Sequence, residues 1–342
     1  MSNTFKLRKK PEGAVDIYED HKNFPEELKK LTALFSEMTG RGDHPLSPIT
    51  VRNYVQKINR LAVLITGHGY NGSIDFLKNY GNVLEKISAS DLSAKKDYMS
   101  PVVRLMKHYK FDPELIAPYN KAMASYKQDE DKDRKTNRAN AKEKSLAMPL
   151  SEIQRKIKDF KPENDAELAQ KVIVSFYFMN PYFTPRNDLY NMKFVNYNKK
   201  PNKMDNNSNY ITVDKNMVPQ QIIMNAYKTA RTYGRQRFNI SEDLKKVLVE
   251  YIKSYGKQTG DYVFVDKNGQ PFKDSNFRNL IESSMEHIVG VPINIDLARK
   301  IKITDYYSKV HTIAEDERFA QSFLHSTGVQ KEYLKVDLFS DE

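Results

Sequence analysis

Four basic side chains and one late tyrosine are the residues of this sequence best suited to chemistry. They are spread over the second half of the chain: Arg186 in Thr-Pro-Arg-Asn-Asp, Lys228 in Tyr-Lys-Thr, Arg299, His325 in Leu-His-Ser, and Tyr333. Arginine keeps its charge at physiological pH and binds anionic oxygens with a fork of donors. A tyrosine oxygen is a nucleophile once its hydroxyl, with a free pKa of about 10, is activated. The set therefore suits attack on an anionic ester.

The composition excludes several other kinds of chemistry. The 342 residues include no cysteine, which excludes disulfides, thiolate catalysis and Cys-ligated zinc. The sequence has no P-loop, GxGxxG, HExxH or GxSxG motif, so nucleotide hydrolysis, dinucleotide chemistry and the common hydrolases have no local support. Lys and Arg number 55 against 44 Asp and Glu, and the net charge of +11 indicates a polyanionic partner.

The order of the candidate residues resembles that of the tyrosine recombinase (phage-integrase-like) family. The family has an arginine, a lysine on a β-hairpin, a second arginine, a histidine followed by Ser or Thr, and a tyrosine near the C-terminus. The resemblance covers residues 148–342, and the helical first half is similar to the family's core-binding domain in architecture only. The Tyr-Lys-Thr and Leu-His-Ser segments resemble the diverged integrases of large DNA viruses and their mobile elements.

The resemblance implies a site-specific recombinase or integrase that cleaves and rejoins duplex DNA. Arg186, Arg299 and His325 would hold the scissile phosphate. Tyr333 would attack it to give a 3′-phosphotyrosine and a free 5′-hydroxyl, and Lys228 would protonate the departing oxygen. Because the covalent link conserves the bond energy, no ATP, metal or other cofactor is implied. The expected assembly is a homotetramer on two DNA sites, and a monomer or dimer when free.

Two carboxylates are candidate accessory residues. Asp188 resembles a carboxylate that the family has after its first arginine, and Asp296 stands where the family usually has a histidine. By residue type alone, Asp296 suits a helix N-cap better than a catalytic base, and each carboxylate could instead pair with the arginine near it. Tyr306 and Tyr307 compete with Tyr333 as nucleophile, but they precede the histidine.

The helices and strands expected from the sequence around these residues indicate a mostly α (α+β) fold. Apolar residues at helical spacing indicate a helical domain over residues 21–127, after a basic, flexible lead-in over 1–20. The resemblance implies that this helical domain binds DNA. Residues 128–147 contain a highly charged run and are expected to form a linker or an exposed helix tail. Residues 148–342 are predicted to form the catalytic domain, with a small antiparallel sheet.

Several element boundaries can be predicted from capping and turn residues. Ser47-Pro48 should begin a helix that ends at Gly67, and Ser241 should cap another that ends at Gly256. Segments rich in β-branched and aromatic residues between turns indicate strands. The predicted strands cover residues 210–213, 221–227 and 262–265.

Further cations are expected to contact DNA phosphates. They lie off the apolar stripe of the helix that begins after Ser47, or soon after Lys228 in the sequence. These are Arg52, Lys57, Arg60, Arg231, Arg235 and Arg237.

Two other functions stay open at this point. A type IB topoisomerase would use nearly the same five residues as a monomer that relaxes supercoils. A non-catalytic DNA-binding protein on a recombinase scaffold would bind DNA without a covalent adduct, and Asp296 in place of histidine favours it. No apolar run is long enough to cross a bilayer and the N-terminus lacks the apolar core of a signal peptide, so we expect an intracellular protein.

Overall fold

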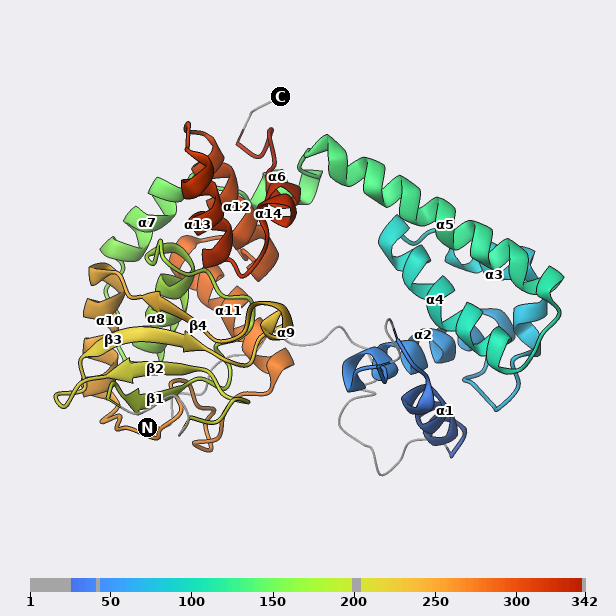
Figure 1. Ribbon diagram of the computed structural model, residues 1–342, viewed down its shortest axis with the longest axis horizontal. Coiled ribbons are helices and arrows are strands. Elements are labelled where there is room, and N and C mark those ends of the chain that lie inside the picture. The colour runs from blue at the N-terminus through green and yellow to red at the C-terminus, as the bar shows by residue number, and fades with distance from the viewer. Residues whose placement is uncertain (1–25, 41–43, 199–203, 340–342) are drawn as a thin grey trace. The chain divides into compact units, whose positions relative to one another are not determined.

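The computed structural model describes residues 26–40, 44–198 and 204–339 of the chain. This part is mostly helical and contains one small sheet (Figure 1), which confirms the predicted α+β fold class. The lead-in predicted over 1–20 lies outside the described residues. None of the described helices combines the length and the apolar character that crossing a membrane requires.

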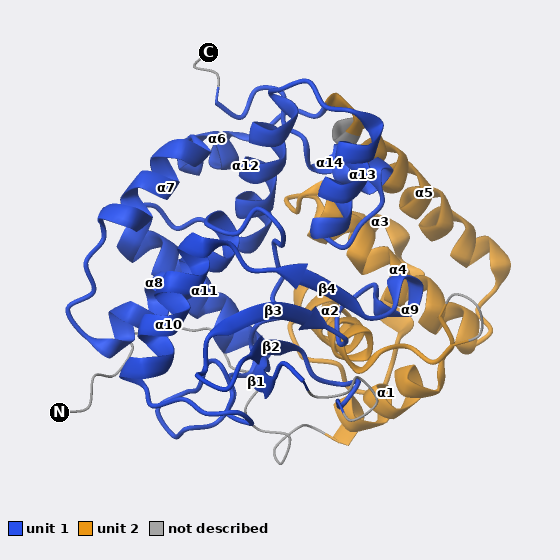
Figure 2. Ribbon diagram, turned by 60° about the vertical axis from the view of Figure 1, so that its left-hand side comes forward, with its two compact units in different colours: residues 1–10, 137–342 blue, residues 11–136 orange. Residues whose placement is uncertain are grey.

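The chain divides into two compact units, which Figure 2 shows in different colours. The described part of the first runs from Glu26 to Thr136, and that of the second begins at Asn137. Each unit has its own buried cluster of apolar side chains. We therefore describe the two units separately.

The regular elements of the described first unit are helices, apart from an isolated bridge between Thr39 and Pro45. The cap predicted for its longest early helix is confirmed: Ser47 accepts from the backbone N–H of Thr50, and Gly67 ends the helix at φ 77°. The helices are α1 (Glu26–Glu37), α2 (Pro48–Thr66), the 3-10 turn η2 (Asp75–Lys78), α3 (Tyr80–Ile87), α4 (Leu92–His108) and α5 (Pro113–Thr136). Residues 128–136 of the predicted linker are thus the last turns of α5, which is one of the two forms expected for them.

The second unit surrounds helix α8 (Asp165–Phe178), whose residues from Val172 onward are all buried, with helices and the sheet. Helices α10 (Glu242–Ser254) and α11 (Asp274–Val289) pack against α8, and Ser241 caps α10 as predicted. Because α8 is buried on almost every side, the turn that follows it is held from several directions. The other helices are α6 (Ala141–Leu146), α7 (Leu150–Asp159), α9 (Ala230–Tyr233), α12 (Ile295–Tyr307), α13 (Ile313–Ser322) and α14 (Thr327–Tyr333).

The sheet is mixed rather than wholly antiparallel, which corrects the prediction. Its order is β1 (Lys193–Asn196), β2 (Tyr210–Val213), β3 (Pro219–Met224), β4 (Gln236–Asn239). The last three strands pair antiparallel, but β1 and β2 are parallel, with Phe194 opposite Ile211. A parallel pair needs a long return connection, and the Asn- and Lys-rich segment between β1 and β2 supplies it.

Two of the three predicted strands differ in the structure. Strand β2 covers 210–213 as predicted, whereas β3 ends at Met224 because the side chain of Asn209 accepts from the backbone N–H groups of Asn225 and Ala226. Residues 262–265 form only isolated bridges, one of them between Lys193 and Tyr262. Its backbone bonds alongside β1 are few: Val263 donates its N–H to the carbonyl of Met192, and Phe194 donates its N–H to the carbonyl of Asp261.

Candidate active site

Arg299 lies at the centre of the candidate site. It projects from α12 and is 2% exposed. Its Nη1 donates to the carbonyl of Thr184 at 2.9 Å and its Nη2 to the carbonyl of Phe323 at 3.1 Å. Burial and the charge of Arg186 lower the pKa of Arg299 to about 10, so the guanidinium stays charged at neutral pH.

The charge of Arg299 is not neutralised by an ion pair with a described carboxylate. Asp188 and Asp296 raise its pKa through charge alone, and its Nε is buried without a hydrogen-bond partner among the described residues. Burying a cation without an opposite charge to pair with it is costly. The site is therefore prepared to bind an anion.

His325 contacts Arg299 directly. Its Nε2 faces Nη2 of Arg299, and the imidazole is 6% exposed. Burial, followed by the charges of Arg299 and Arg186, lowers the pKa of His325 to about 3. The imidazole is therefore neutral at neutral pH. The preceding residue, Leu324, is buried at φ 59°, a conformation that non-glycine residues adopt only when their surroundings enforce it.

Tyr333 is the last residue of α14, and its ring stacks on His325. The ring centroids are 5.2 Å apart with 25° between the planes, and the guanidinium carbon of Arg299 lies 5.5 Å from the tyrosine ring. The side chain of Ser326 caps α14 by accepting from the N–H of Val329. The Leu-His-Ser segment therefore places both the histidine and the start of the tyrosine helix.

Arg186 and Asp188 lie in the turn after α8. The Asp188 carboxylate accepts from the backbone N–H of Arg186 at 3.1 Å, and no ion pair joins the two side chains. Tyr177 donates to the carbonyl of Arg186 at 2.6 Å, and the amide of Asn187 donates to Asp274. Burial raises the pKa of Asp188. The turn is thus held rigidly, and the charge of Arg186 reaches both Arg299 and His325.

Lys228 lies in the connection between the antiparallel strands β3 and β4, and its side chain is exposed. The next residue, Thr229, donates its hydroxyl to the carbonyl of Leu324 at 3.1 Å. The buried amide of Asn209 donates to the carbonyls of Asp188 and Ala226. These bonds join the Lys228 segment to the histidine loop and to the Arg186 turn, although Lys228 itself contacts none of the other four candidates in the described structure.

A buried lysine, Lys302, was not found from the sequence. It follows Arg299 by three residues on α12, is 5% exposed, and donates to the carbonyl of Asn180 at 2.9 Å and the hydroxyl of Thr184 at 2.6 Å. Burial and then Arg299 lower its pKa to about 7. Thr184 is thus bonded by two cations of α12, which fixes the segment before Arg186. Only its position one helical turn after Arg299 could have singled it out.

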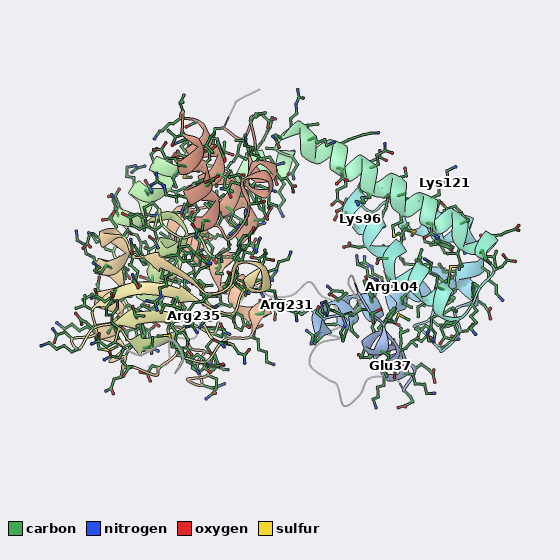
Figure 3. The ribbon with its side chains drawn as sticks, in the orientation of Figure 1. Glu37, Lys96, Arg104, Lys121, Arg231 and Arg235 are labelled. Atoms are coloured by element: carbon green, nitrogen blue, oxygen red, sulfur yellow. The ribbon has the colours of Figure 1, made fainter. Side chains whose placement is uncertain are left out.

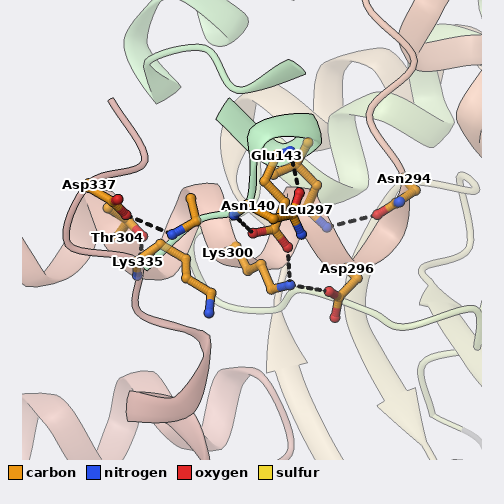
Figure 4. Close-up of polar contacts among 10 residues, drawn as sticks. Asn140, Glu143, Asn294, Asp296, Leu297, Lys300, Thr304, Lys335 and Asp337 are labelled. Atoms are coloured by element: carbon orange, nitrogen blue, oxygen red, sulfur yellow. Dashed lines mark hydrogen bonds and ion pairs between the residues drawn. The ribbon is translucent and has the colours of Figure 1, made fainter. Parts of the chain in front are cut away.

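The prediction that Asp296 is a helix N-cap is wrong. Asn294 caps α12 by accepting from the N–H of Leu297, and Asp296 lies in the first turn. Figure 4 shows Lys300 between Asp296, at 2.6 Å, and Glu143, at 2.5 Å. The cap belongs to Asn294 because its side chain precedes the first helical residue. Asp296 pairs with this lysine rather than with Arg299.

The segment after Tyr333 is fixed by polar contacts, some of which Figure 4 also shows. Lys335 donates its backbone N–H to the hydroxyl of Thr304 at 3.1 Å, and Val336 donates its N–H to the carbonyl of Asn137 at 2.9 Å. The Asp337 carboxylate accepts from the N–H of Ala139 at 2.7 Å. The end of α14 is therefore tied to residues 137–139.

The cations expected to contact DNA differ in their surroundings. Figure 3 shows Arg231 on α9 and Arg235 just before β4. Arg231 and Arg237 are exposed, whereas Arg235 donates to Asn225 and Asn206. In the first unit, the ammonium of Lys57 lies 4.5 Å from the centroid of the Tyr98 ring. Arg52 and Arg60 are exposed on α2.

The competing tyrosines are less suited to be the nucleophile. The ring of Tyr306 stacks between His311 and Phe319, with centroids 3.6 Å from each. Burial and Asp316 raise the pKa of Tyr306 to about 12, and burial also raises the pKa of Tyr307. Both shifts oppose formation of the phenolate that attack requires.

A pocket of about 340 Å³ opens beside His325. It is lined on one side by Leu324, His325 and Ser326, and on another by Tyr233 and Gln236. The pocket gives an incoming group access to the buried histidine. Among the described residues, no group of three His, Asp or Glu side chains could hold a metal ion.

Comparisons with known proteins do not assign a family to this chain. No family model matches the chain, and no curated protein matches it. Among solved structures it is similar to the crystal structure of XerA recombinase, with a TM-score of 0.36 and 15% sequence identity over 90% of this chain and 92% of that chain. The branch of large DNA viruses and mobile elements therefore stays a prediction.

Proposed function

We propose that this protein cleaves and rejoins duplex DNA through a tyrosine–phosphate bond, as a site-specific recombinase or integrase. One observation carries the proposal: the buried guanidinium of Arg299, which forms no ion pair with a described residue, contacts both His325 and the ring of Tyr333. Arg186 adds a second positive charge near this cluster. An anion binding here would offset the cost of burying the charge.

The geometry supports distinct roles for these residues. Arg186 and Arg299 bind the non-bridging oxygens of the phosphate, where charge builds up during attack. Tyr333 gives up its hydroxyl proton to water when its oxygen attacks. The tyrosine oxygen bonds to phosphorus, the bond to the 5′ oxygen breaks, and Lys228 gives that oxygen its proton. A neutral His325 keeps Arg299 oriented, since its Nε2 faces the guanidinium.

The partner in this proposal is double-stranded DNA. The exposed Arg231 and Arg237, with the cations of α2, would bind phosphates along the duplex. Strand exchange between two sites would need four active tyrosines, so a homotetramer on DNA is part of the proposal, assembled from monomers or dimers.

The test uses suicide DNA substrates whose nick prevents rejoining. We expect wild-type protein to form an adduct that survives denaturing detergent, and Tyr333→Phe, which keeps the ring and removes the nucleophilic oxygen, to form none. Tyr306→Phe is the matched control and should form the adduct normally. An adduct that persists in Tyr333→Phe would contradict the assignment of the nucleophile, and DNA binding without any adduct would favour the non-catalytic alternative.

A second assay separates the two enzymatic alternatives. Wild-type protein is incubated with supercoiled plasmid and, separately, with pairs of marked target sites. Recombination of the marked sites supports the proposal, whereas relaxation alone would favour a type IB topoisomerase.

A further inference from the structure

Gln330 is a buried amide that the proposed chemistry does not use. It lies on α14 one helical turn before Tyr333, and it is 0% exposed. Neither its amide oxygen nor its amide nitrogen has a well-formed hydrogen bond with a described residue. Burying an amide without hydrogen bonds destabilises the fold, so a glutamine at this buried position needs an explanation.

The neighbour of this amide is His325. Gln330 acts on the imidazole as a hydrogen-bond partner that opposes the fall of its pKa. Nδ1 of His325 is likewise buried without a well-formed bond to a described residue. Two unsatisfied polar groups thus lie together in the site, one on the imidazole and one on the helix that carries Tyr333. Such bonds are often long in a free enzyme and shorten when substrate binds.

The tautomer of His325 follows from its other nitrogen. Nε2 faces a guanidinium, which has only donors, so Nε2 must be the acceptor and carry no proton. In a neutral imidazole the proton is then on Nδ1, which needs an acceptor of its own. Gln330 acts on this imidazole as a hydrogen-bond partner, and its amide oxygen has no other partner among the described residues.

We propose that Gln330 is a positioning residue that holds His325 in the Nδ1-protonated tautomer, and so aligns the imidazole between Arg299 and Tyr333. Residues 330 and 333 lie on the same face of α14 because they are three apart. One face of α14 therefore carries both the tyrosine ring that stacks on the imidazole and the amide that determines which ring nitrogen holds the proton. The inference rests on the proposed function only for its effect on DNA cleavage.

The first experiment reads the tautomer directly, in full-length protein labelled with ¹⁵N-histidine. The signal of His325 is assigned with His325→Gln. We expect an Nδ1-protonated ring in the wild type at pH 7, and a rising share of the Nε2-protonated form in Gln330→Met, which keeps the side-chain length without a strong acceptor. Gln330→Glu restores an acceptor and should restore the Nδ1-protonated form. An Nε2-protonated wild type, or a Gln330→Met spectrum identical to the wild type, overturns the proposal.

The second experiment measures single-turnover adduct formation at saturating DNA. Orienting partners of this kind typically contribute about 10- to 100-fold, so we expect Gln330→Met to slow the adduct by that factor with DNA affinity unchanged. The matched control is Val329→Ala, an exposed neighbour on the same helix. An unchanged rate in Gln330→Met overturns the positioning role. A wild type that forms no adduct contradicts the proposed function, while the tautomer experiment still decides the role of Gln330.

Discussion

The cations of α12 and those around α9 have opposite environments. Arg299 and Lys302 are buried, and both donate to the segment just before Arg186. Arg231 and Arg237 are exposed to solvent. A buried cation without a carboxylate destabilises the fold unless an anion arrives, whereas an exposed one is hydrated and screened by salt. Under the proposed function, we expect chemistry to depend on the buried pair and general DNA affinity on the exposed pair.

Replacing the guanidinium group of Arg299 should have the largest effect on adduct formation. Arg299→Lys keeps the charge and loses the planar donors, so single-turnover adduct formation should fall by about 10²–10³-fold. DNA affinity, measured by fluorescence anisotropy, should change little. Arg231→Lys is the matched control and should cleave normally. Equal losses in the two variants would remove the distinction between buried and exposed cations.

Lys302 should make stability depend on pH. Its pKa is about 7 in the folded protein and 10.5 when unfolded, so the unfolded state binds more protons in between. Stability should therefore rise with pH from 7 towards 10, by up to about 1.4 kcal/mol per pH unit from this group. Lys302→Met should lose that part of the slope in denaturant unfolding at pH 7, 8 and 9. The exposed Lys309→Met should keep it, and equal slopes in both variants would contradict the lowered pKa of Lys302.

The hydroxyl of Thr229 should have a smaller effect. Thr229→Val removes its bond to the carbonyl of Leu324, at a cost of about 1 kcal/mol in the free energy of unfolding. Because Leu324 directly precedes His325, cleavage should also slow several-fold, as measured by adduct formation. Thr229→Ser keeps the hydroxyl and should behave as the wild type, and Thr232→Val on α9 controls for the loss of a hydroxyl elsewhere.

The exposed cations should give the smallest effect on catalysis. The double variant Arg231→Gln, Arg237→Gln should reduce the slope of log affinity against log salt by about 1 per residue. Its adduct rate at saturating DNA should match the wild type. Anisotropy titrations between 50 and 200 mM salt test this, with the exposed Lys253→Gln on α10 as control. Slower adduct formation together with an unchanged salt slope would contradict the distinction between buried and exposed cations.

Local signals in the sequence predicted much of the fold. Ser47 and Gly67 bound α2, Ser241 caps α10, and β2 has the predicted residues, because caps and turns depend on side chains a few positions apart. Strand β1 was missed, since its parallel partner lies beyond a long connection and no local pattern reports such pairing. The segment 262–265 has strand-like residues, but its neighbours leave it only isolated bridges.

The candidate site could be predicted only in part. The order of Arg186, Arg299, His325 and Tyr333 singled them out, and the structure gathers these four by contact or charge. Their supporting groups have no such signal. Lys302 resembles any lysine in the sequence, and the burial that lowers its pKa arises only when α12 packs against the turn after α8. The roles of Lys228 and Asp296 stay predictions.

The hydrogen bonds beyond α14 have a mechanical consequence. Val336 is bonded to Asn137, the first residue after α5, and Asp337 to Ala139. Tyr333 is thus connected to the end of α5 through one backbone hydrogen bond and the three residues that follow it. In the proposed mechanism, this short connection would limit how far the hydroxyl of Tyr333 can move during attack.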